Sequence, residues 1–207
     1  MKSEDRKNLL SLYEDRFEKY GNDVKTVGWG SIEDQNLRFD MLFRGININN
    51  KSILDLGCGL GDLVNYLNNN STDDFQYTGI DLSEKLIEQA ISNHPNENIN
   101  FLVQNIFDWE LPKADIVVAS GMLTFNVPDN KDNIEHIIQK LFSYADETLA
   151  LNFMSSYVDF ELDKNLHFAP EKIFSYAKKN TNWVNIYHDY PLYEFTIQLN
   201  KKASCGY

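Results

Sequence analysis

The stretch Ile53-Leu54-Asp55-Leu56-Gly57-Cys58-Gly59-Leu60-Gly61-Asp62 decides the fold of this chain. Three glycines on alternate positions follow a short apolar run, so the backbone there can turn tightly and approach a ligand closely. Asp81 comes about twenty residues later, after the second apolar run Tyr77-Thr78-Gly79-Ile80. An acidic side chain in that place faces the ribose of a nucleoside lying across the end of the first strand. Together the two features predict a nucleoside-binding site.

The spacing of the glycines separates this loop from a dinucleotide-binding loop. A dinucleotide fingerprint reads Gly-x-Gly-x-x-Gly and receives a pyrophosphate at the N-terminus of the next helix. Here the third glycine comes one residue early, and Asp62 stands where that pattern has glycine or alanine. A carboxylate in the first helical turn repels a diphosphate and suits a ligand without phosphate. Asp55 adds a second carboxylate, which can face a cationic group.

The segments Asp55-Leu56-Gly57-Cys58-Gly59-Leu60-Gly61 and Gly79-Ile80-Asp81-Leu82-Ser83 resemble the cofactor motifs of class I S-adenosylmethionine (SAM) methyltransferases. In that family the glycine loop wraps the methionine part of SAM, and the acidic residue after the second strand binds the ribose. SAM carries a sulfonium and an amino group but no phosphate, in agreement with the two carboxylates. The resemblance implies SAM as cofactor, S-adenosylhomocysteine (SAH) as product, and a bacterial small-molecule subgroup. It does not identify the methyl acceptor.

The same resemblance implies further cofactor contacts. After the third strand, family members commonly place an Asp that accepts a hydrogen bond from the adenine amino group. Asn105 stands there and can accept that bond through its carbonyl, while Asp108 is the alternative acceptor. The residues after the fourth strand are expected under the methionine part. The expected cofactor-binding residues are Asp55, Gly57, Cys58, Gly59, Gly61, Asp81, Leu82, Asn105, Ile106, Ser120, Gly121, Trp29 and Arg38.

From Lys51 onward, short apolar runs alternate with amphipathic helical patterns. Such alternation predicts an α/β fold, with a parallel sheet covered by helices on both faces. After Pro170 two strands, Trp183–His188 and Leu192–Leu199, are separated by so few residues that they must be antiparallel neighbours. We therefore expect a Rossmann-like, mostly parallel seven-stranded sheet with a C-terminal antiparallel hairpin. The remaining expected strands are 51–56, 75–81, 99–104, 114–119 and 146–153, with helices at 62–69, 83–93 and 131–144.

The first 50 residues predict a helical cap. Apolar residues recur at helical spacing from Ser3 to Tyr20, and Gly21 ends that helix. A second helix begins at Ser31, after Gly28-Trp29-Gly30, whose flanking glycines suggest a lid over the cofactor. We interpret the chain as one domain, 1–207, with a cap at 1–50 and a core at 51–207 that carries an insertion at about 154–170.

Composition limits the partners. The 207 residues, 43% of them hydrophobic, fit one globular domain. No run approaches the roughly 18 apolar residues of a membrane span, and the charged N-terminus does not resemble a signal peptide. Cys58 and Cys205 are the only cysteines, which favours a cytoplasmic setting. The net charge of −12 counts against nucleic acid as a partner. We also expect a small-molecule acceptor, no membrane contact, and a monomer or homodimer.

The acceptor site is less determined. Arg38 is expected to pair with a carboxylate of the cofactor or with a substrate anion. A hydroxyl acceptor benefits from a general base, for which His167 is the candidate, whereas a carboxylate or phosphoryl oxygen needs only a cation such as Arg38 or Arg16. No set of His, Cys and carboxylate residues has metal-ligand spacing, so no metal is expected. The expected acceptor-site residues are Tyr13, Arg16, Tyr157, Asp159 and Tyr193.

The predicted function is methyl transfer from SAM to an oxygen of a small polar molecule. Three segments, Gly28-Trp29-Gly30-Ser31, Asn152-Phe153-Met154-Ser155 and His188-Asp189-Tyr190, resemble bacterial methyltransferases, some of which are associated with surface polysaccharide. A sugar or phosphoryl-type capsule precursor is therefore one expected acceptor. Two alternatives stay open. A non-catalytic SAM-binding regulator would bind SAM without turnover, and a nicotinamide-dependent oxidoreductase, against which Asp62 speaks, would bind NAD(H) instead.

Overall fold

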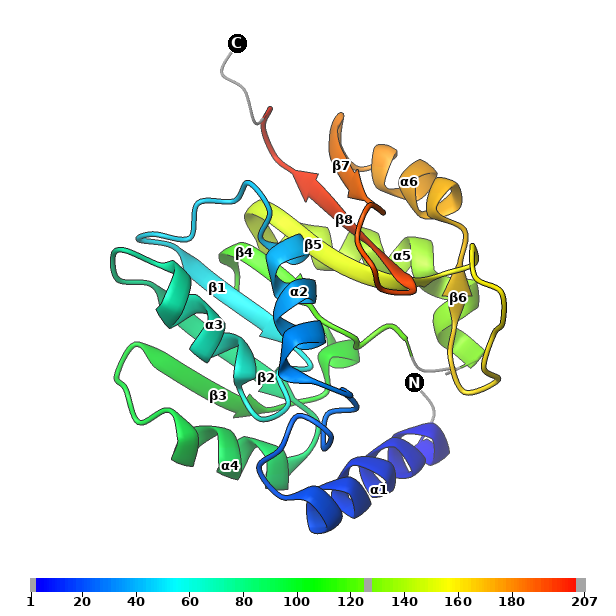
Figure 1. The fold of residues 1–207 in the computed structure, drawn as a ribbon. Coiled ribbons are helices and arrows are strands. Elements are labelled where there is room, and N and C mark those ends of the chain that lie inside the picture. Colours follow the sequence, from blue (N-terminus) through cyan, green and yellow to red (C-terminus); the bar gives the residue numbers. More distant parts are fainter. Residues whose placement is uncertain (1–2, 125–127, 204–207) are drawn as a thin grey trace.

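A computed structural model describes residues 3–124 and 128–203 of the chain. One sheet carries its strands in the order β3-β2-β1-β4-β5-β8-β7, with β6 paired to β5, and helices cover both faces (Figure 1). The strands are β1 (Ser52–Leu56), β2 (Gln76–Asp81), β3 (Ile99–Val103), β4 (Ala114–Ala119), β5 (Ala145–Ser155), β6 (His167–Phe168), β7 (Trp183–Tyr187) and β8 (Glu194–Asn200). The helices are α1 (Ser3–Tyr20), α2 (Ile32–Leu42), α3 (Asp62–Asn70), α4 (Glu84–Asn93), the 3₁₀ turn η1 (Ile106–Asp108), α5 (Pro128–Tyr144) and α6 (Pro170–Lys178).

The parallel part of the sheet confirms the α/β expectation. Strands β1 to β5 pair only in parallel with one another. From β1 the chain moves outward through β2 to β3 and then returns to β4 on the other side of β1. Strand order therefore reverses between β1 and β4, and ligands of such sheets bind outside the carboxyl ends of the strands at that place.

The C-terminal hairpin is also present, with one detail that matters for the site. Strand β8 is antiparallel to both β5 and β7 and lies between them. Because β8 runs opposite to β5, its first residue, Glu194, pairs with Met154 near the end of β5. An acidic side chain from the last strand thus reaches the ligand-binding edge. The two-residue strand β6, parallel to β5, was not expected from the sequence.

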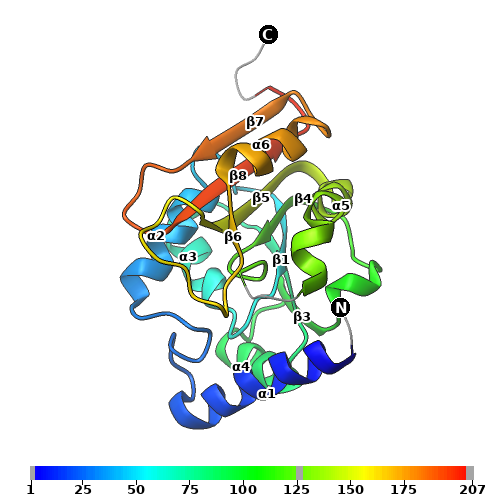
Figure 2. The same cartoon turned by 90° about the vertical axis from the view of Figure 1, so that its right-hand side faces the viewer.

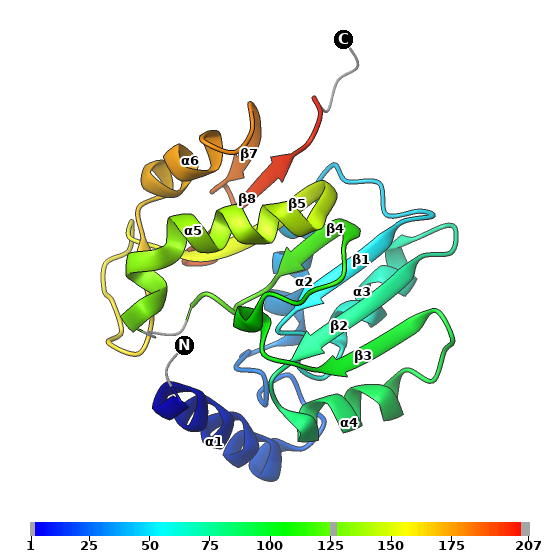
Figure 3. The ribbon, with the colours of Figure 1, turned by 180° about the vertical axis from the view of Figure 1, so that it is seen from behind.

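The central strands β1 and β4 are buried on both faces, which explains their continuous apolar runs. Successive side chains of a strand point to opposite faces. Ile53 accordingly packs in a cluster with α2, α3 and α4, while Leu54 packs in a cluster with α5 and α6. Seen along the sheet, α2 and α3 lie on one side and α5 on the other (Figure 2). The view from behind shows α5 crossing β4 and β5 (Figure 3).

The cap has the predicted helix boundaries. Gly21 has a φ of 59° and donates its N–H to Phe17, so it ends α1. Ser31 caps α2 by accepting from the N–H of Asp34. Helix α1 lies beside α4 at the carboxyl edge of the sheet (Figures 1 and 3), where Lys85 pairs with two glutamates of α1. Within the described ranges, no helix is long and apolar enough to cross a bilayer.

Candidate active site

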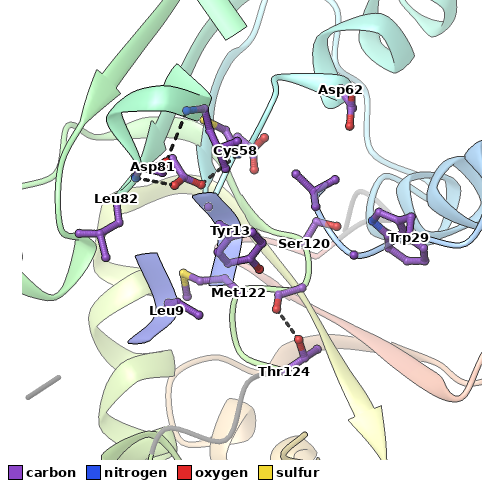
Figure 4. A pocket seen from close by; sticks show the side chains of 18 of the residues that line it. Leu9, Tyr13, Trp29, Cys58, Asp62, Asp81, Leu82, Ser120, Met122 and Thr124 are labelled. Atoms are coloured by element: carbon purple, nitrogen blue, oxygen red, sulfur yellow. Dashed lines mark hydrogen bonds between the residues drawn. The ribbon is translucent and has the colours of Figure 1, made fainter. Parts of the chain in front are cut away.

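A cavity of about 350 Å³ lies at the carboxyl ends of β1, β2 and β4. The loops after these three strands form its floor, and α1, the 27–29 segment and α2 form its roof and one wall. Figure 4 shows Leu9 and Tyr13 reaching from α1 into the cavity near Asp81 and Met122. The cavity therefore occupies the place where the reversal of strand order predicts a ligand.

The backbone conformation of the loop after β1 requires glycine at three positions. Gly57, Gly59 and Gly61 have φ values of 77°, 55° and 79°, in the left-handed region. A Cβ on Gly59 would lie 2.6 Å from Cγ1 of Val27, in the loop before α2. The 27–29 segment, which includes Trp29 and is called the lid below, is thus packed directly on the glycine loop and lines the cavity. That it covers the cofactor stays a prediction.

Asp81 is fixed by backbone donors. Its Oδ2 accepts the N–H of Gly59 at 3.0 Å, and its Oδ1 accepts the N–H of Ser83 at 2.9 Å. Burial raises the pKa of Asp81, and the backbone hydrogen bonds from Ser83, Gly59 and Leu82 oppose that rise. The carboxylate is therefore held in one orientation at the cavity wall, with lone pairs left for a ligand hydroxyl.

Asp55 is a buried carboxylate with one oxygen unpaired. Its Oδ2 accepts a hydrogen bond of 2.7 Å from Tyr77, while its buried Oδ1 accepts none from any described residue. Burial, reinforced by Asp81 and Asp62 and opposed by the Tyr77 hydrogen bond, raises the pKa of Asp55 to about 7. An unpaired buried carboxylate oxygen is suited to a cationic ligand group.

The residues after β3 distinguish the two candidates for adenine recognition. Asn105 lines the cavity, whereas Asp108 does not. Asn105 donates from Nδ2 to Asp108 at 2.8 Å and accepts the N–H of Phe107 at 3.2 Å. Asp108 thus orients the Asn105 amide, and of the two only Asn105 is placed to meet a ligand. The neighbouring Ile106 also lines the cavity.

Other expected cofactor residues lie where the sequence places them. Leu82, Ser120 and Gly121 line the cavity after β2 and β4. Cys58 lines it too, and burial raises the pKa of its thiol well above the ordinary value, so it stays protonated. Cys58 is therefore a small loop residue rather than a nucleophile. Cys205 lies outside the described residues.

Arg38 lines the cavity and is paired within the protein. Its Nε and Nη2 donate to Glu194, whose side chain is as buried as its own. Trp29 lies over the guanidinium, with 3.9 Å between the guanidinium carbon and the ring centroid. Asn152 donates to Glu194 at 2.8 Å and accepts the N–H of Gly121 at 2.9 Å. The carboxylate partner of Arg38 in this structure comes from the protein itself.

Two of the expected acceptor-site residues reach the cavity. Tyr13 and Arg16 line it from the same face of α1. Burial raises the pKa of Tyr13, with a further contribution from the charge of Asp81, so its phenol is neutral. Arg16 has a buried Nη1 that makes no hydrogen bond within the described part of the chain.

Four expected residues do not reach the cavity. His167 is buried on β6, where its Nδ1 lies 2.7 Å from the carbonyl oxygen of Ser155, so that nitrogen carries the proton. Tyr157 and Tyr193 are 67% and 61% exposed, and Asp159 is also exposed. None of the four lines the cavity. Segment 156–166 leaves Tyr157 and Asp159 exposed before the chain enters β6. Tyr193 is exposed just before β8 begins, and pairing of β6 with β5 holds His167 in the sheet.

Sequence reasoning missed several lining residues. Glu194 and Lys164 line the cavity, and Asn152 connects Glu194 to the β4 loop. A glutamate at the start of β8, directly before a strand with alternating apolar residues, was the available signal for the first of these. No cluster of three or more His, Cys, Asp or Glu side chains suited to a metal occurs in 3–124 and 128–203.

Comparisons with known proteins agree with this geometry. Residues 48–190 match the family described as a methyltransferase domain. A protein of Mycobacterium tuberculosis (strain ATCC 25618 / H37Rv), named as a methyltransferase, is 34% identical over 163 residues, which cover 74% of this chain and 94% of that protein.

Solved structures share the fold at lower identity. The DhpI–SAH complex has a TM-score of 0.70 and 19% identity, covering 93% of this chain and 95% of that one. Magnesium protoporphyrin IX methyltransferase from Synechocystis PCC 6803, solved with bound SAH, has a TM-score of 0.66 and 16% identity, covering 96% and 100%. From its sequence family and its architecture, the chain belongs to the methyltransferase domain family and has the class I methyltransferase fold.

Proposed function

We propose that this methyltransferase uses SAM to methylate an oxygen of a small polar molecule. The observation that carries the proposal is the carboxylate of Asp81, fixed by the N–H groups of Gly59 and Ser83 at the rim of a tight glycine loop. Such a carboxylate is suited to the two hydroxyls of a ribose. Relatives solved with SAM or SAH bound share the fold, which supports the same choice.

The residues present fit that cofactor. Asn105 would meet the adenine, Asp81 the ribose, and the glycine loop with Gly121 the methionine part. The unpaired Oδ1 of Asp55 would face a cationic group of the ligand. Bound SAM supplies an electrophilic methyl group. The chain's own part is to hold the acceptor in line with that group and to exclude water, and the α1 roof and the lid are placed for this.

A cavity of about 350 Å³ that must hold cofactor and acceptor together favours a small acceptor. The acceptor side of the cavity is formed by α1, Met154 and residues 162–165. An oxygen acceptor such as a sugar or a phosphoryl-type precursor of surface polysaccharide meets this description. The family match favours methyl transfer over the nicotinamide-dependent alternative.

Calorimetry with SAM, SAH and NAD⁺ tests the proposal. We expect SAH and SAM to bind and NAD⁺ not to bind. Asp81→Ala should weaken SAH binding by about tenfold or more, roughly 1.4 kcal/mol, because two ribose hydrogen bonds are lost. Asp73→Ala, at an exposed loop position, is the matched control. Unchanged affinity of the Asp81 variant would contradict the assignment, and tight SAM binding without SAH formation on a broad acceptor panel would favour a non-catalytic regulator.

A further inference from the structure

We propose that the methyl acceptor is an oxygen anion, a carboxylate or a phosphoryl group, and that Arg16 receives its charge. The proposal rests on the proposed function and specifies the chemical class of the acceptor. It starts from one observation: the cavity contains an arginine whose buried nitrogen lacks a partner. Arg16 lines the cavity from α1, and its Nη1 makes no hydrogen bond to any residue in the described ranges.

A buried guanidinium N–H without an acceptor is a costly arrangement, because its interaction with water is lost and nothing replaces it. The neighbours of Arg16 do not satisfy it. Its Nη1 lies on the backbone of Gly28, 3.1 Å from the position of a Cβ there, and its guanidinium lies 5.8 Å from the ring centroid of Tyr13. An anion in the cavity would supply the missing acceptor with a charge-assisted hydrogen bond.

The other arginine that lines the cavity shows the contrast. Arg38 donates from Nε and Nη2 to Glu194, so its charge is already balanced inside the protein. Arg16 forms no ion pair with any described carboxylate. Of the two arginines, Arg16 is therefore the one whose charge a ligand anion can balance.

A second cation reaches the same cavity from another element. Lys164, in the segment between β5 and β6, lines the cavity and forms no ion pair with the described residues. Because α1 and segment 156–166 are far apart in sequence, two independent parts of the chain each place a cation on the lining of this cavity, Arg16 with a buried nitrogen and Lys164 as an exposed side chain. Both types of cation donate charge-assisted hydrogen bonds to oxyanions.

The ionisable groups of the cavity support an acceptor that is already ionised. No histidine lines the cavity among the residues described, and the phenol of Tyr13 is neutral because its pKa is raised. A neutral hydroxyl would need a base, whereas an oxyanion needs none. A lone pair of the acceptor oxygen forms the new O–CH₃ bond, and the S–CH₃ bond breaks with its electron pair remaining on sulfur. The acceptor loses one negative charge, the sulfonium becomes a neutral thioether, and no proton moves.

Arg16 could instead hold the carboxylate of the cofactor, and a first measurement separates the two roles. Calorimetry compares SAH with 5′-methylthioadenosine, which lacks the amino-acid part, on the unmodified protein and on Arg16→Gln. We expect the Arg16 variant to bind both within twofold of the unmodified protein. A variant that keeps methylthioadenosine affinity but loses SAH affinity by tenfold or more would overturn the proposal. Arg44→Gln, which removes an exposed arginine paired with Asp189, is the matched control.

A second measurement tests the anion itself. The SAH-saturated protein is titrated with methylphosphonate, with acetate and with neutral 2-propanol, and binding is followed by NMR. We expect one of the two anions to bind in the millimolar range, 2-propanol not to bind, and Arg16→Gln to weaken the anion by about tenfold, with Arg16→Lys in between. The anion that binds better identifies the phosphoryl or the carboxylate class. If the protein binds SAH but neither anion, or if Arg16→Gln leaves the affinity for the anion unchanged, this inference alone is contradicted. Failure to bind SAH would contradict the proposed function.

Discussion

Glu194 accepts two hydrogen bonds from the guanidinium of Arg38, which joins the first residue of β8 to the cap helix α2. Asn152 donates to the same carboxylate and also accepts the N–H of Gly121. Trp29 covers the guanidinium from the lid. One buried network therefore ties the lid, the cap, the last strand and the loop after β4 into a single unit around the cavity.

Removing the carboxylate of this pair should destabilise the protein strongly. Glu194→Gln leaves the buried charge of Arg38 without its partner, and loss of one member of a buried pair costs roughly 3–5 kcal/mol. Chemical denaturation measures the free energy of unfolding. Glu135→Gln, which breaks the exposed pair with Lys179, should change it by no more than about 1 kcal/mol. Equal effects of the two variants would show that the buried network does not hold the cap.

The contact between the lid and the glycine loop makes a separate prediction. Gly59→Ala places a methyl group 2.6 Å from Val27 at a φ of 55°. We expect SAH affinity to fall by at least tenfold, because the lid or the loop must move. Combining it with Val27→Ala should restore part of that affinity but not all, since the left-handed backbone still costs roughly 1 kcal/mol. Gly30→Ala, with open space around it, is the control and should leave calorimetric affinity unchanged.

Asp55 should make stability depend on pH in a defined direction. Its pKa is about 7 in the folded protein and about 3.9 when unfolded, so the folded state holds the extra proton between those values. The free energy of unfolding should therefore fall as pH rises from about 4 to about 7. In the unmodified protein this decrease in the free energy of unfolding should reach up to about 4 kcal/mol at pH 8, and Asp55→Asn should abolish it. A cationic ligand favours the charged carboxylate, so SAM binding near neutral pH should release a proton that calorimetry in different buffers detects.

Asp115 is the control of opposite sign. Hydrogen bonds from the N–H and hydroxyl of Ser52 lower the pKa of Asp115. Its contribution to stability is present above the unfolded pKa and is lost as pH falls. Asp115→Asn should therefore alter the acid limb of the stability profile and leave the slope of that profile between about pH 5 and 8 unchanged. An Asp55→Asn profile parallel to that of the unmodified protein would contradict the assigned pKa.

The parts of the site that sequence predicted are those that local rules determine. The glycine loop follows β1, Asp81 ends β2 and Asn105 comes two residues after β3, and in a parallel sheet all these strand ends meet at one edge. Strand and helix positions followed from apolar periodicity in the same way. The partner of Arg38 was not predictable, because Glu194 is 156 positions away and reaches the cavity only through the reversed direction of β8.

The acceptor side was predicted least well for a related reason. His167 was assigned as a base because it follows β5 in sequence, but pairing of β6 with β5 fixes its ring against Ser155. Lys164 was overlooked because nothing in its neighbouring residues marks it as facing a cavity. The course of segment 156–166 decides both outcomes, and that course depends on tertiary packing rather than on a local pattern.

The reversed β8 also has a consequence for biosynthesis. A ribosome makes the arginine of the cap early and its partner glutamate only near the end of the chain, since 156 positions separate them. Nascent protein that has completed the parallel strands but not β8 must hold α2 with an unneutralised guanidinium facing the interior. The pair that joins the cap to β8 beside the cavity can therefore form only when translation is nearly finished. Truncated chains that end before β8 should form the parallel strands but not bind the cofactor.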